Sequence, residues 1–377
     1  MTVPFAFQCL TKMNERGASD LYLTNGFKPS LRIENHLEMI GDTVLNEEII
    51  QDILSSILTA RQMRDYEAKM ELNTALDMGE YGRFRVNVFR QRQMPGLVIR
   101  RIISKIPSLE ELKLPNVLSQ MAMEARGLVL VTGMTGSGKS TTLASMLNYR
   151  NERTEGHILT IEDPIEYYHE HKKSVVTQRE VGVDTESYFV ALKNALRQRP
   201  DVILIGEIRD REVMEQALTI AETGHLCLAT LHTNNAYQAI ERIVNFFPEE
   251  FHNQTRLNLS MNLKSIISQR LLPSQKGGQV PALEILVNQA LIREQIQSGD
   301  YEKIPEVMEQ NSSIGMCTFD QSLIKLYAEG HITEETAITQ SDKSSDMAVK
   351  IRQIKLGKGG GGLRDLDTSN LKISDAY

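Results

Sequence analysis

The chain has 377 residues, a formal net charge of −7 at pH 7 and a hydrophobic content of 41%. A single core seldom grows beyond about 250–300 residues, so two folded domains and a tail are expected. No apolar run approaches the ~18 residues of a membrane-spanning helix and the N-terminus lacks a signal-peptide layout, which predicts a cytosolic protein. The acidic balance disfavours a protein that lives on DNA or anionic lipid. The cysteines Cys9, Cys227 and Cys317 are odd in number and far apart, so they form neither a disulfide framework nor a CxxC zinc knuckle.

The first hundred residues mix strand and helix signals. Residues 46–70 carry isoleucines and leucines on one helical stripe behind Asn46, a residue type that caps helix N-termini. The strand candidates are residues 18–24, 29–40, 71–78, 82–91 and 95–102. These elements predict a small α+β domain over residues 1–104. Pro107 and Pro115 bracket a connector, so residues 105–116 are expected to be a linker.

From about residue 117 short apolar strands alternate with amphipathic helices, which is typical of a mainly parallel, helix-covered α/β sheet. The strand candidates are residues 127–133, 157–163, 201–207 and 225–233. Each ends in a polar group, and ligands gather at the carboxyl ends of such strands, so one shared site is expected. Residues 257–272 repeat leucine and isoleucine at helical spacing and are predicted to be a core helix. The α/β domain is expected over 117–345, and residues 346–377 as a flexible tail.

Residues 133–140 read GMTGSGKS and fit the phosphate-loop pattern GxxxxGK[ST] between a predicted strand and a helix-forming stretch. The glycines let successive N–H groups curl around a β-phosphate, and the helix N-terminus adds partial positive charge. Lys139 is expected to reach the β- and γ-phosphates of ATP, and Ser140 to ligate Mg²⁺. The alternative is a glycine-rich turn that binds nothing. The predicted nucleotide ligands are Gly133, Met134, Thr135, Gly136, Ser137, Gly138, Lys139 and Ser140.

Carboxylates follow the next two predicted strands, where hydrolysis would need a water-activating group and a metal-side carboxylate. Glu207 lies beyond the strand that ends at Ile205 and is the first candidate for the base. The segment ILTIEDPIEYY offers Glu162, Asp163 and Glu166, of which Glu162 is assigned to the Mg²⁺ shell and Glu166 to direct assistance. Each of them can alternatively be a solvated turn residue.

Two histidines flank the run HLCLATLH, which raises the question of a metal site. His225 and His232 are seven positions apart, so an extended strand between them spans roughly 23 Å and points them to opposite faces. They cannot share one metal ion in that case, and a core strand with separate end groups is predicted. His232, at the carboxyl end, is expected to sense the γ-phosphate. His225 is expected to brace that state at a domain or subunit contact.

Four segments, GMTGSGKST, ILTIEDPIEY, LRQRPDVILIGEIRD and AETGHLCLATLHT, resemble the Walker A, Asp box, Walker B and His box of secretion-type ATPases. These are the hexameric motors of type II secretion and type IV pili. With RGASDLYLTNGFKPSLRI near its start, the chain is most similar to the pilus retraction branch, the PilT/PilU family. The resemblance implies an N-terminal PAS-like domain, a C-terminal RecA-like ATPase domain, a ring of six subunits, and Thr141 as a further nucleotide ligand.

Within this family the chain resembles PilU-type members more than PilT-type members. The PilT retraction signature AIRNLIRE corresponds here to residues 291–298, LIREQIQS, which keep the Ile-Arg pair and lose most of the rest. The chain also continues through residues 315–332 into a C-terminal extension of the PilU kind. The resemblance therefore implies an accessory retraction ATPase that acts beside a PilT-type partner on one pilus machine.

The resemblance also assigns roles to individual residues. Glu207 matches the Walker B glutamate, Glu166 the last glutamate of the Asp box, and His225 and His232 the His-box pair. In this family, arginines of the N-terminal domain reach the nucleotide of a neighbouring subunit. Arg85 and Arg100 match these trans-acting arginines, with Arg83 close behind, and all three can alternatively be ordinary surface charge on strands.

The implied function is an ATP-driven motor that acts on a PilC-like inner-membrane platform protein and draws pilin out of the fibre. It implies a homo-hexamer at the cytoplasmic face of the inner membrane, with peripheral membrane association through the pilus machine. One alternative is a structural or regulatory ring subunit that binds ATP but hydrolyses little. Another is a RecA-like motor on nucleic acid, which the acidic balance disfavours, so no nucleic-acid partner is expected.

Overall fold

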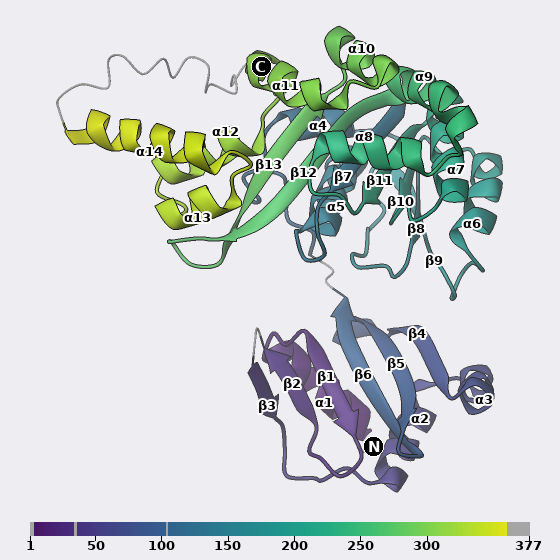
Figure 1. The fold of residues 1–377 in the computed structure, drawn as a ribbon. Helices are drawn as coiled ribbons and strands as arrows, with labels where there is room; N and C mark the ends of the chain where they lie inside the picture. The colour runs from purple at the N-terminus through teal and green to yellow at the C-terminus, as the bar shows by residue number, and fades with distance from the viewer. Residues whose placement is uncertain (1–3, 34–35, 103–104, 360–377) are drawn as a thin grey trace. The chain divides into compact units, whose positions relative to one another are not determined.

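The computed structural model describes residues 4–33, 36–102 and 105–359. The chain divides into two compact units, both drawn in Figure 1. Unit 1 comprises Met1–Lys105 and Ile165–Tyr168, and unit 2 comprises Ile106–Pro164 and His169–Tyr377. The expected linker 105–116 is not a free connector, because its residues from Ile106 onward belong to unit 2 and Leu109 is buried in the core there.

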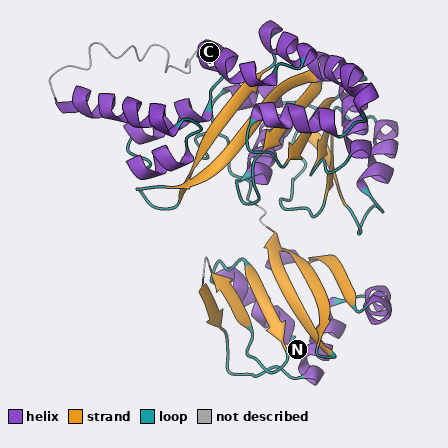
Figure 2. Ribbon diagram, in the orientation of Figure 1, coloured by secondary structure: helices purple, strands orange, loops and turns teal. Residues whose placement is uncertain are grey.

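Unit 1 is a six-stranded antiparallel sheet packed against helices, which confirms the predicted α+β domain (Figure 2). The strands lie in the order β3-β2-β1-β6-β5-β4. Their bounds are β1 Asp20–Thr24, β2 Ser30–Ile33, β3 His36–Met39, β4 Glu71–Asp77, β5 Arg83–Gln91 and β6 Met94–Ile102. Along β5, Phe84, Val86 and Val88 are buried while the residues between them are partly exposed. This alternation gives the sheet one apolar face and one polar face.

The helices of unit 1 are α1 Phe5–Glu15, α2 Glu47–Ile57 and α3 Ala60–Lys69. Asn46 caps α2 as predicted, since its side chain accepts a hydrogen bond from Ile49 N at 2.9 Å. The single helix expected over residues 46–70 is in fact two helices. Thr59 starts the second one with a capping box to Gln62, a signal that the continuous hydrophobic stripe obscured. Helix α1, at the start of the chain, was not among the predicted elements.

Unit 2 contains a seven-stranded sheet in the order β13-β12-β7-β11-β10-β8-β9. All neighbours pair in parallel except β12 and β13, which form an antiparallel edge. The bounds are β7 Gly127–Thr132, β8 Gly156–Glu162, β9 Ser174–Glu180, β10 Val202–Ile205, β11 Leu226–Leu231, β12 Leu263–Pro273 and β13 Gln279–Val287. Four of these, β7, β8, β10 and β11, lie where the sequence predicted strands. The predicted RecA-like α/β domain is thereby confirmed.

Helices cover both faces of this sheet, as Figure 1 shows. Along β7, Leu128 and Leu130 face one apolar core, whereas Val129 and Val131 face another. The helices are α4 Val117–Ala122, α5 Lys139–Asn151, α6 Tyr188–Ala195, α7 Arg211–Glu222, α8 Ala236–Asn245, α9 His252–Asn262, α10 Ala290–Ser298, α11 Ile304–Gln310, α12 Phe319–Ala328, α13 Glu334–Gln340 and α14 Ser344–Gly359. Short 3₁₀ turns lie at Gly79–Tyr81, Leu196–Gln198, Glu249–Phe251, Tyr301–Lys303 and Ser312–Ile314. No helix of the described residues has the length and apolarity needed to cross a bilayer.

The core helix predicted over residues 257–272 is wrong. Helix α9 ends at Asn262, and β12 then runs from Leu263 to Pro273 between β13 and β7. Because β12 is paired on both edges and mostly buried on both faces, its apolar residues do not alternate with polar ones. A buried strand of this kind has the same apolar periodicity as a buried helix, which is why spacing alone misassigned it.

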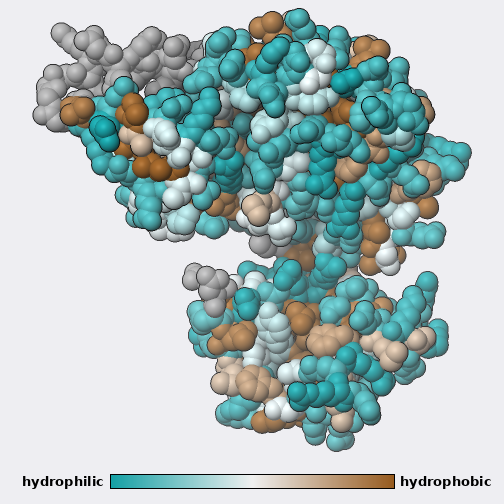
Figure 3. All heavy atoms as spheres, viewed as in Figure 1, coloured by the Kyte–Doolittle hydropathy of each residue, from teal (hydrophilic) through white to brown (hydrophobic). Residues whose placement is uncertain are grey.

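The flexible tail expected over residues 346–377 is wrong for its first part. Residues 346–359 lie in α14, and Met347 and Ile351 are buried against α12 and the β12–β13 hairpin. The rest of the expected tail, 360–377, lies outside the described residues. Figure 3 shows a largely hydrophilic surface on the face of unit 2 in view. Met347 and Ile351 lie one turn apart on α14, and the partly buried Ile354 packs against the same core.

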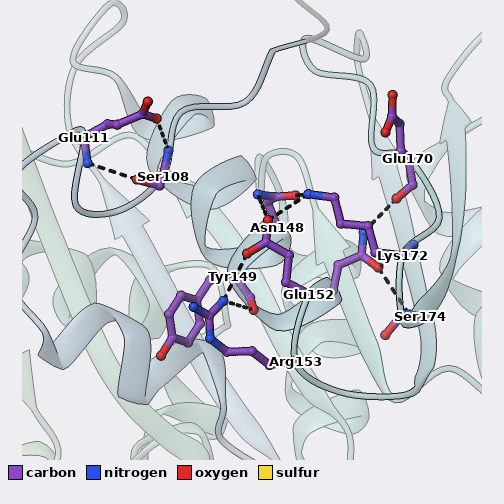
Figure 4. A network of polar contacts seen from close by, with 10 residues as sticks. Ser108, Glu111, Asn148, Tyr149, Glu152, Arg153, Glu170, Lys172 and Ser174 are labelled. Carbon is purple, nitrogen blue, oxygen red and sulfur yellow. Dashed lines mark hydrogen bonds and ion pairs between the residues drawn. The ribbon is translucent and has the colours of Figure 1, made fainter.

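A polar network fixes the end of α5 that lies away from the phosphate loop (Figure 4). Lys172 Nζ donates to Asn148 Oδ1 at 2.9 Å and to Glu152 Oε1 at 2.7 Å. The hydrogen bond from Lys172 holds the pKa of Glu152 below its usual range. The backbone N–H groups of Lys172 and Ser174 both donate to Asn151 Oδ1 at 3.2 Å. The helix that begins at the phosphate loop is thereby anchored at its far end.

Candidate functional site

The phosphate loop occupies residues 133–138, between β7 and the first residue of α5. Gly133 and Gly138 have positive φ angles of 144° and 86°. A Cβ on Gly133 would lie 2.4 Å from the carbonyl oxygen of Gln269, and a Cβ on Gly138 would lie 2.7 Å from Nε2 of the same residue. Glycine is therefore required at both positions, by backbone conformation and by the close approach of β12.

Lys139 and Ser137 supply the polar groups of this loop. Lys139 is 8% exposed, and its Nζ donates to the carbonyl oxygens of Gly133 at 2.8 Å and Met134 at 2.9 Å. The hydroxyl of Ser137 is buried and makes no hydrogen bond within the described part of the chain. Buried hydroxyls are rarely left without a partner, so this orphaned group and the curled loop fit a phosphate ligand.

The side chains that the sequence analysis assigned to one shared site follow neighbouring strands and lie beside the phosphate loop. Strands β7, β11, β10 and β8 are adjacent and parallel, so the polar residues after them gather at one edge of the sheet. Glu162 ends β8, Glu207 lies two residues beyond β10, and His232 directly follows β11. The structure thus brings Glu207 and His232 together, as their places on the strands predicted.

Glu207 is the centre of a chain of polar contacts. Its Oε1 lies 3.2 Å from Nε2 of His232, and its Oε2 accepts from Arg209 Nε at 2.7 Å. Arg209 Nη1 donates in turn to Asp163 Oδ2 at 3.1 Å. Arg209 therefore links the acidic residue after β8 to the one after β10. Arg209 had no predicted role, although it lies in the segment GEIRD only two positions from Glu207.

Tyr188 and Gly206 pack closely together beside this cluster of polar contacts. A Cβ on Gly206 would lie 2.8 Å from the Tyr188 hydroxyl and 3.1 Å from Cα of Glu162. Burial, followed by the neighbouring Asp163, raises the pKa of the Tyr188 phenol. Glycine at position 206 thus lets β10 and β8 approach each other closely at the ends that carry Glu207 and Glu162. No sequence signal singled out Tyr188, which comes from α6.

The electrostatics of the site follow from these contacts. Burial lowers the pKa of His232, the positive charge of Lys139 lowers it further, and Glu207 opposes both. The hydrogen bond to Glu207 raises the pKa of Arg209. At neutral pH His232 is therefore a neutral imidazole that can donate from one ring nitrogen and accept at the other. Lys139 acts on His232 because the phosphate loop after β7 and the histidine after β11 lie at the same edge of the sheet.

Residues that could hold Mg²⁺ are Ser140, at the second position of α5, and Glu162. Glu162 Oε1 accepts from Thr160 Oγ1 at 2.6 Å and from Gln178 Nε2 at 3.1 Å, which orients its carboxylate. No group of three or more His, Cys, Asp or Glu side chains in the described residues is arranged to hold a metal ion. This donor set fits Mg²⁺, which takes only one or two protein ligands and the rest from phosphates and water.

Two further predicted residues are His225 and Glu166. His225 precedes β11, at the opposite end of the strand from His232, and its Nδ1 lies 3.2 Å from the Thr223 hydroxyl. Its carbonyl oxygen accepts from Gly127 N at 3.0 Å. Glu166 is exposed and belongs to the segment Ile165–Tyr168 of unit 1.

The predicted trans-acting arginines lie on the polar face of the sheet in unit 1. Arg85 on β5 is directly opposite Arg100 on β6, so the two side chains share one face. Arg100 Nε donates to Asp20 Oδ1 at 2.7 Å, and Asp20 is only 3% exposed. Arg83 pairs with Asp77 at 3.0 Å and its guanidinium lies 4.0 Å from the Tyr168 ring centroid. The arrangement gathers positive charge and fixes Arg100 through a buried carboxylate.

Two hollows in unit 2 flank the phosphate loop. One, of about 1150 Å³, is lined by the outer side of the loop, by Asn235 and by residues near the end of α13. The other, of about 420 Å³, is lined by Gly138 and Thr141 together with Leu114 and the β12–β13 hairpin. Both exceed the ~300 Å³ at which ligand pockets begin, so there is open space on either side of the loop, although neither hollow is lined by Lys139, Glu207 or His232.

The family described as "Type II/IV secretion system protein" matches residues 6–339 of the chain. The chain belongs to this family. Among its relatives, the type IV pilus ATPase PilU of Pseudomonas aeruginosa is 47% identical over 344 residues, which cover 91% of this chain and 90% of PilU. The retraction ATPase PilT of the same organism is 43% identical over 323 residues, covering 86% and 94% of the two chains.

The solved structures agree with this assignment. The crystal structure of the pilus retraction motor PilT with bound ADP matches with a TM-score of 0.86 at 41% identity, covering 92% of this chain and 99% of that one. The predicted membership of the PilT/PilU branch is therefore confirmed. An ADP-bound relative of this similarity also supports nucleotide binding at the phosphate loop.

Proposed function

We propose that the chain is an ATP-hydrolysing motor subunit of type IV pilus retraction, acting as a PilU-like accessory ATPase. The observation that carries this is the meeting of a complete phosphate loop with Glu207 and His232 at one sheet edge. The likeness to PilU and PilT over most of both chains supports the pilus as the place of action. The nucleotide ligands are Gly133 to Thr141.

Glu207 acts as the base that takes a proton from the attacking water. Its carboxylate has about four lone-pair positions, of which Arg209 and His232 occupy two, so acceptor capacity remains for a water. The charge of Lys139 favours the negative charge that grows on the phosphate oxygens. Ser140 and Glu162 hold Mg²⁺, which supplies charge neutralisation at the phosphates when bound.

The two histidines have different tasks. A neutral His232, beside both Glu207 and the loop lysine, donates or accepts one hydrogen bond and thereby reports the γ-phosphate to Glu207. His225, at the far end of the same strand, braces this arrangement at a domain or subunit contact. Strand β11 connects them as a fully buried, rigid element.

The active assembly is a homo-hexamer in which each nucleotide is contacted by two subunits. Arg85 and Arg100, both in unit 1, reach the nucleotide of a neighbouring copy, and Glu166 assists hydrolysis directly. Hydrolysis then moves one domain against the other, as in hinge-type closure. The motor works beside a PilT-type ATPase, at the cytoplasmic face of the inner membrane, on a PilC-like platform protein.

The enzymatic part of this proposal is tested by comparing the ATPase rate of the full-length chain with that of Glu207→Gln. Removal of the base is expected to lower kcat by about 100-fold. Glu212→Gln, an exposed glutamate on the following helix, is the matched control and retains the wild-type rate. Equal rates for wild type and Glu207→Gln would contradict the motor and favour a ring subunit that binds ATP without turning it over.

The pilus part is tested in a strain that lacks this gene and the gene for its PilT-type partner. Restoring both is expected to restore retraction, whereas this chain alone restores little. Full retraction by this chain without the partner would contradict the accessory role.

A further inference from the structure

A buried acidic residue in unit 2 takes no part in the site described above. Glu284, on β13, is 4% exposed, and its Oε1 accepts a hydrogen bond from the backbone N–H of Ala236 at 2.6 Å. Ala236 is the first residue of α8 and follows His232 by four positions. A buried carboxyl is costly, and here it satisfies one of the N–H groups that a helix start leaves without a partner.

The same carboxyl connects back to the phosphate loop through two buried hydroxyls. Ser268 lies directly opposite Glu284 in the β12–β13 ladder, so the two side chains share one face of the sheet, and the Ser268 hydroxyl lowers the pKa of the neighbouring carboxyl. Thr132 Oγ1 donates to Ser268 Oγ at 3.0 Å, and Thr132 is the last residue of β7, immediately before Gly133. A serine hydroxyl can accept from Thr132 and donate to Glu284 at the same time, so the side chains form a buried polar relay, Thr132–Ser268–Glu284–Ala236.

Helix α8 links the Glu284–Ala236 hydrogen bond to His232. Arg242, on α8, donates from Nη1 to the carbonyl oxygen of His232 at 3.1 Å. The segment 232–235 is therefore held at both ends, by Arg242 at its start and by the Glu284–Ala236 bond after its end. A displacement of α8 along its axis would move the His232 backbone, and with it the 3.2 Å contact to Glu207.

We propose that Glu284 is a positioning residue, which locks the start of α8 to the phosphate-loop strand and so sets His232 against Glu207. It touches neither nucleotide nor the reacting atoms and acts only through Ser268 and α8. The inference rests on the proposed function, because it concerns turnover by that same site. A buried polar network of this kind fixes a geometry more strictly than apolar packing does.

Four variants of the full-length chain test this inference. Ser268→Ala and Glu284→Ala break the relay, whereas Glu284→Gln keeps an oxygen that accepts from Ala236. The matched control is Ser265→Ala, because Ser265 is an equally buried serine on the same strand whose hydroxyl donates to Leu286 O at 2.7 Å, outside the relay. Ser265→Ala loses the buried hydrogen bond to Leu286, and Ser268→Ala loses the buried hydrogen bond from Thr132, so a general loss of stability of that kind affects both variants.

We expect Ser268→Ala and Glu284→Ala to lower kcat by about tenfold, with the KM for ATP changed less than about twofold. Ser265→Ala and Glu284→Gln are expected to keep kcat within about threefold of wild type. Hydrogen exchange of the amides of residues 232–240 is measured in parallel and is expected to be faster only in the two relay-breaking variants. Equal kcat and equal exchange in Ser268→Ala and Ser265→Ala would overturn the inference.

The two readouts also separate this inference from the proposed function. A wild-type chain without ATPase activity contradicts the proposed function, while exchange still reports whether the relay holds the start of α8. Normal wild-type activity with unchanged kcat in all four variants contradicts the inference alone. If Glu284→Ala does not fold, Ser268→Ala and Glu284→Gln carry the comparison.

Discussion

His232 Nε2 lies 3.2 Å from Oε1 of Glu207, so the proposed sensor and the proposed base share one direct contact. Arg209 occupies the other oxygen of the same carboxylate. A movement of His232 therefore changes the hydrogen bonding of Glu207 directly, whereas the phosphate ligands of the loop do not depend on this contact. For this reason substitutions here should affect turnover more than nucleotide binding.

Replacing His232 with alanine is expected to lower kcat by about tenfold while changing the KM for ATP less than about threefold, because Lys139 and the loop amides still bind the phosphates. Steady-state ATPase kinetics provide the measurement. His157→Ala is the control, since His157 lies at the start of β8 and its ring contacts Gln198 O and the Thr177 hydroxyl. A loss of ATP binding without loss of kcat would rule out the sensor role.

Gly206→Ala is expected to lower both kcat and thermal stability, because its Cβ would meet the Tyr188 hydroxyl at 2.8 Å and the Glu162 backbone at 3.1 Å. Overpacking of this kind costs about 1–3 kcal/mol. Tyr188→Phe removes the nearer of the two contacts, so Gly206→Ala combined with Tyr188→Phe should recover part of the lost stability. Thermal unfolding of the single and double variants measures this, and strictly additive effects would argue against the contact as the cause.

The trans-acting role proposed for Arg100 predicts complementation between subunits. Arg100→Ala and Glu207→Gln are each expected to be nearly inactive as pure rings. In rings mixed at equal ratio, about a quarter of the interfaces join an intact Glu207 to an intact Arg100, and activity returns there. The ATPase rate of mixed rings is compared with a mixture of Lys139→Ala and Glu207→Gln, two residues of one subunit's site, which cannot complement. No recovery in the first mixture would assign Arg100 to its own subunit or to structure alone.

Glu284 predicts a specific dependence of stability on pH. Burial raises its pKa from 4.5 to about 7, while Arg270 and the Ala236 N–H oppose the rise and Asp342 adds to it. Between these two values the folded chain binds more protons than the unfolded chain, so the free energy of unfolding falls as pH rises. At about 1.4 kcal/mol per unit, the loss is on the order of 3 kcal/mol. Urea unfolding from pH 4.5 to 7.5 should show this fall in wild type and not in Glu284→Gln; parallel curves would refute it.

The phosphate loop and the strand-end residues could be predicted because each depends on a local pattern. A glycine-rich loop and a short apolar strand carry their signal within a few residues, and parallel strands bring their ends together whatever the loop lengths. Glu207 and His232 were found in this way. Their mutual contact follows from strand order, which a linear pattern does not contain.

Gln269, Tyr188 and Glu284 could not be predicted, for different physical reasons. Gln269 lies on β12, where burial on both faces removed the alternation that identifies a strand. Tyr188 reaches the site from α6, and Glu284 acts through Ser268, so both depend on tertiary packing between segments far apart in sequence. Helix α14 was missed because only two of its residues are strongly buried, which is too few to outweigh its polar composition.

Two consecutive residues of strand β12, Gln269 and Arg270, contact different parts of unit 2. Gln269 backs the phosphate loop and accepts from Thr142 Oγ1 at 2.8 Å, whereas Arg270 donates to Asp342 Oδ1 at 3.1 Å and stacks over Phe319. Since successive strand residues point to opposite faces, a slip of one residue would present the arginine to the loop glycines and the glutamine to the C-terminal helices. Insertions and deletions can therefore be absorbed in the turn that joins β12 to β13 or at the register shift between Leu263 and Ser265, but not between Ser265 and Arg270. Homologous chains should keep the spacing between Ser265 and Arg270 even where the sequence around it has diverged.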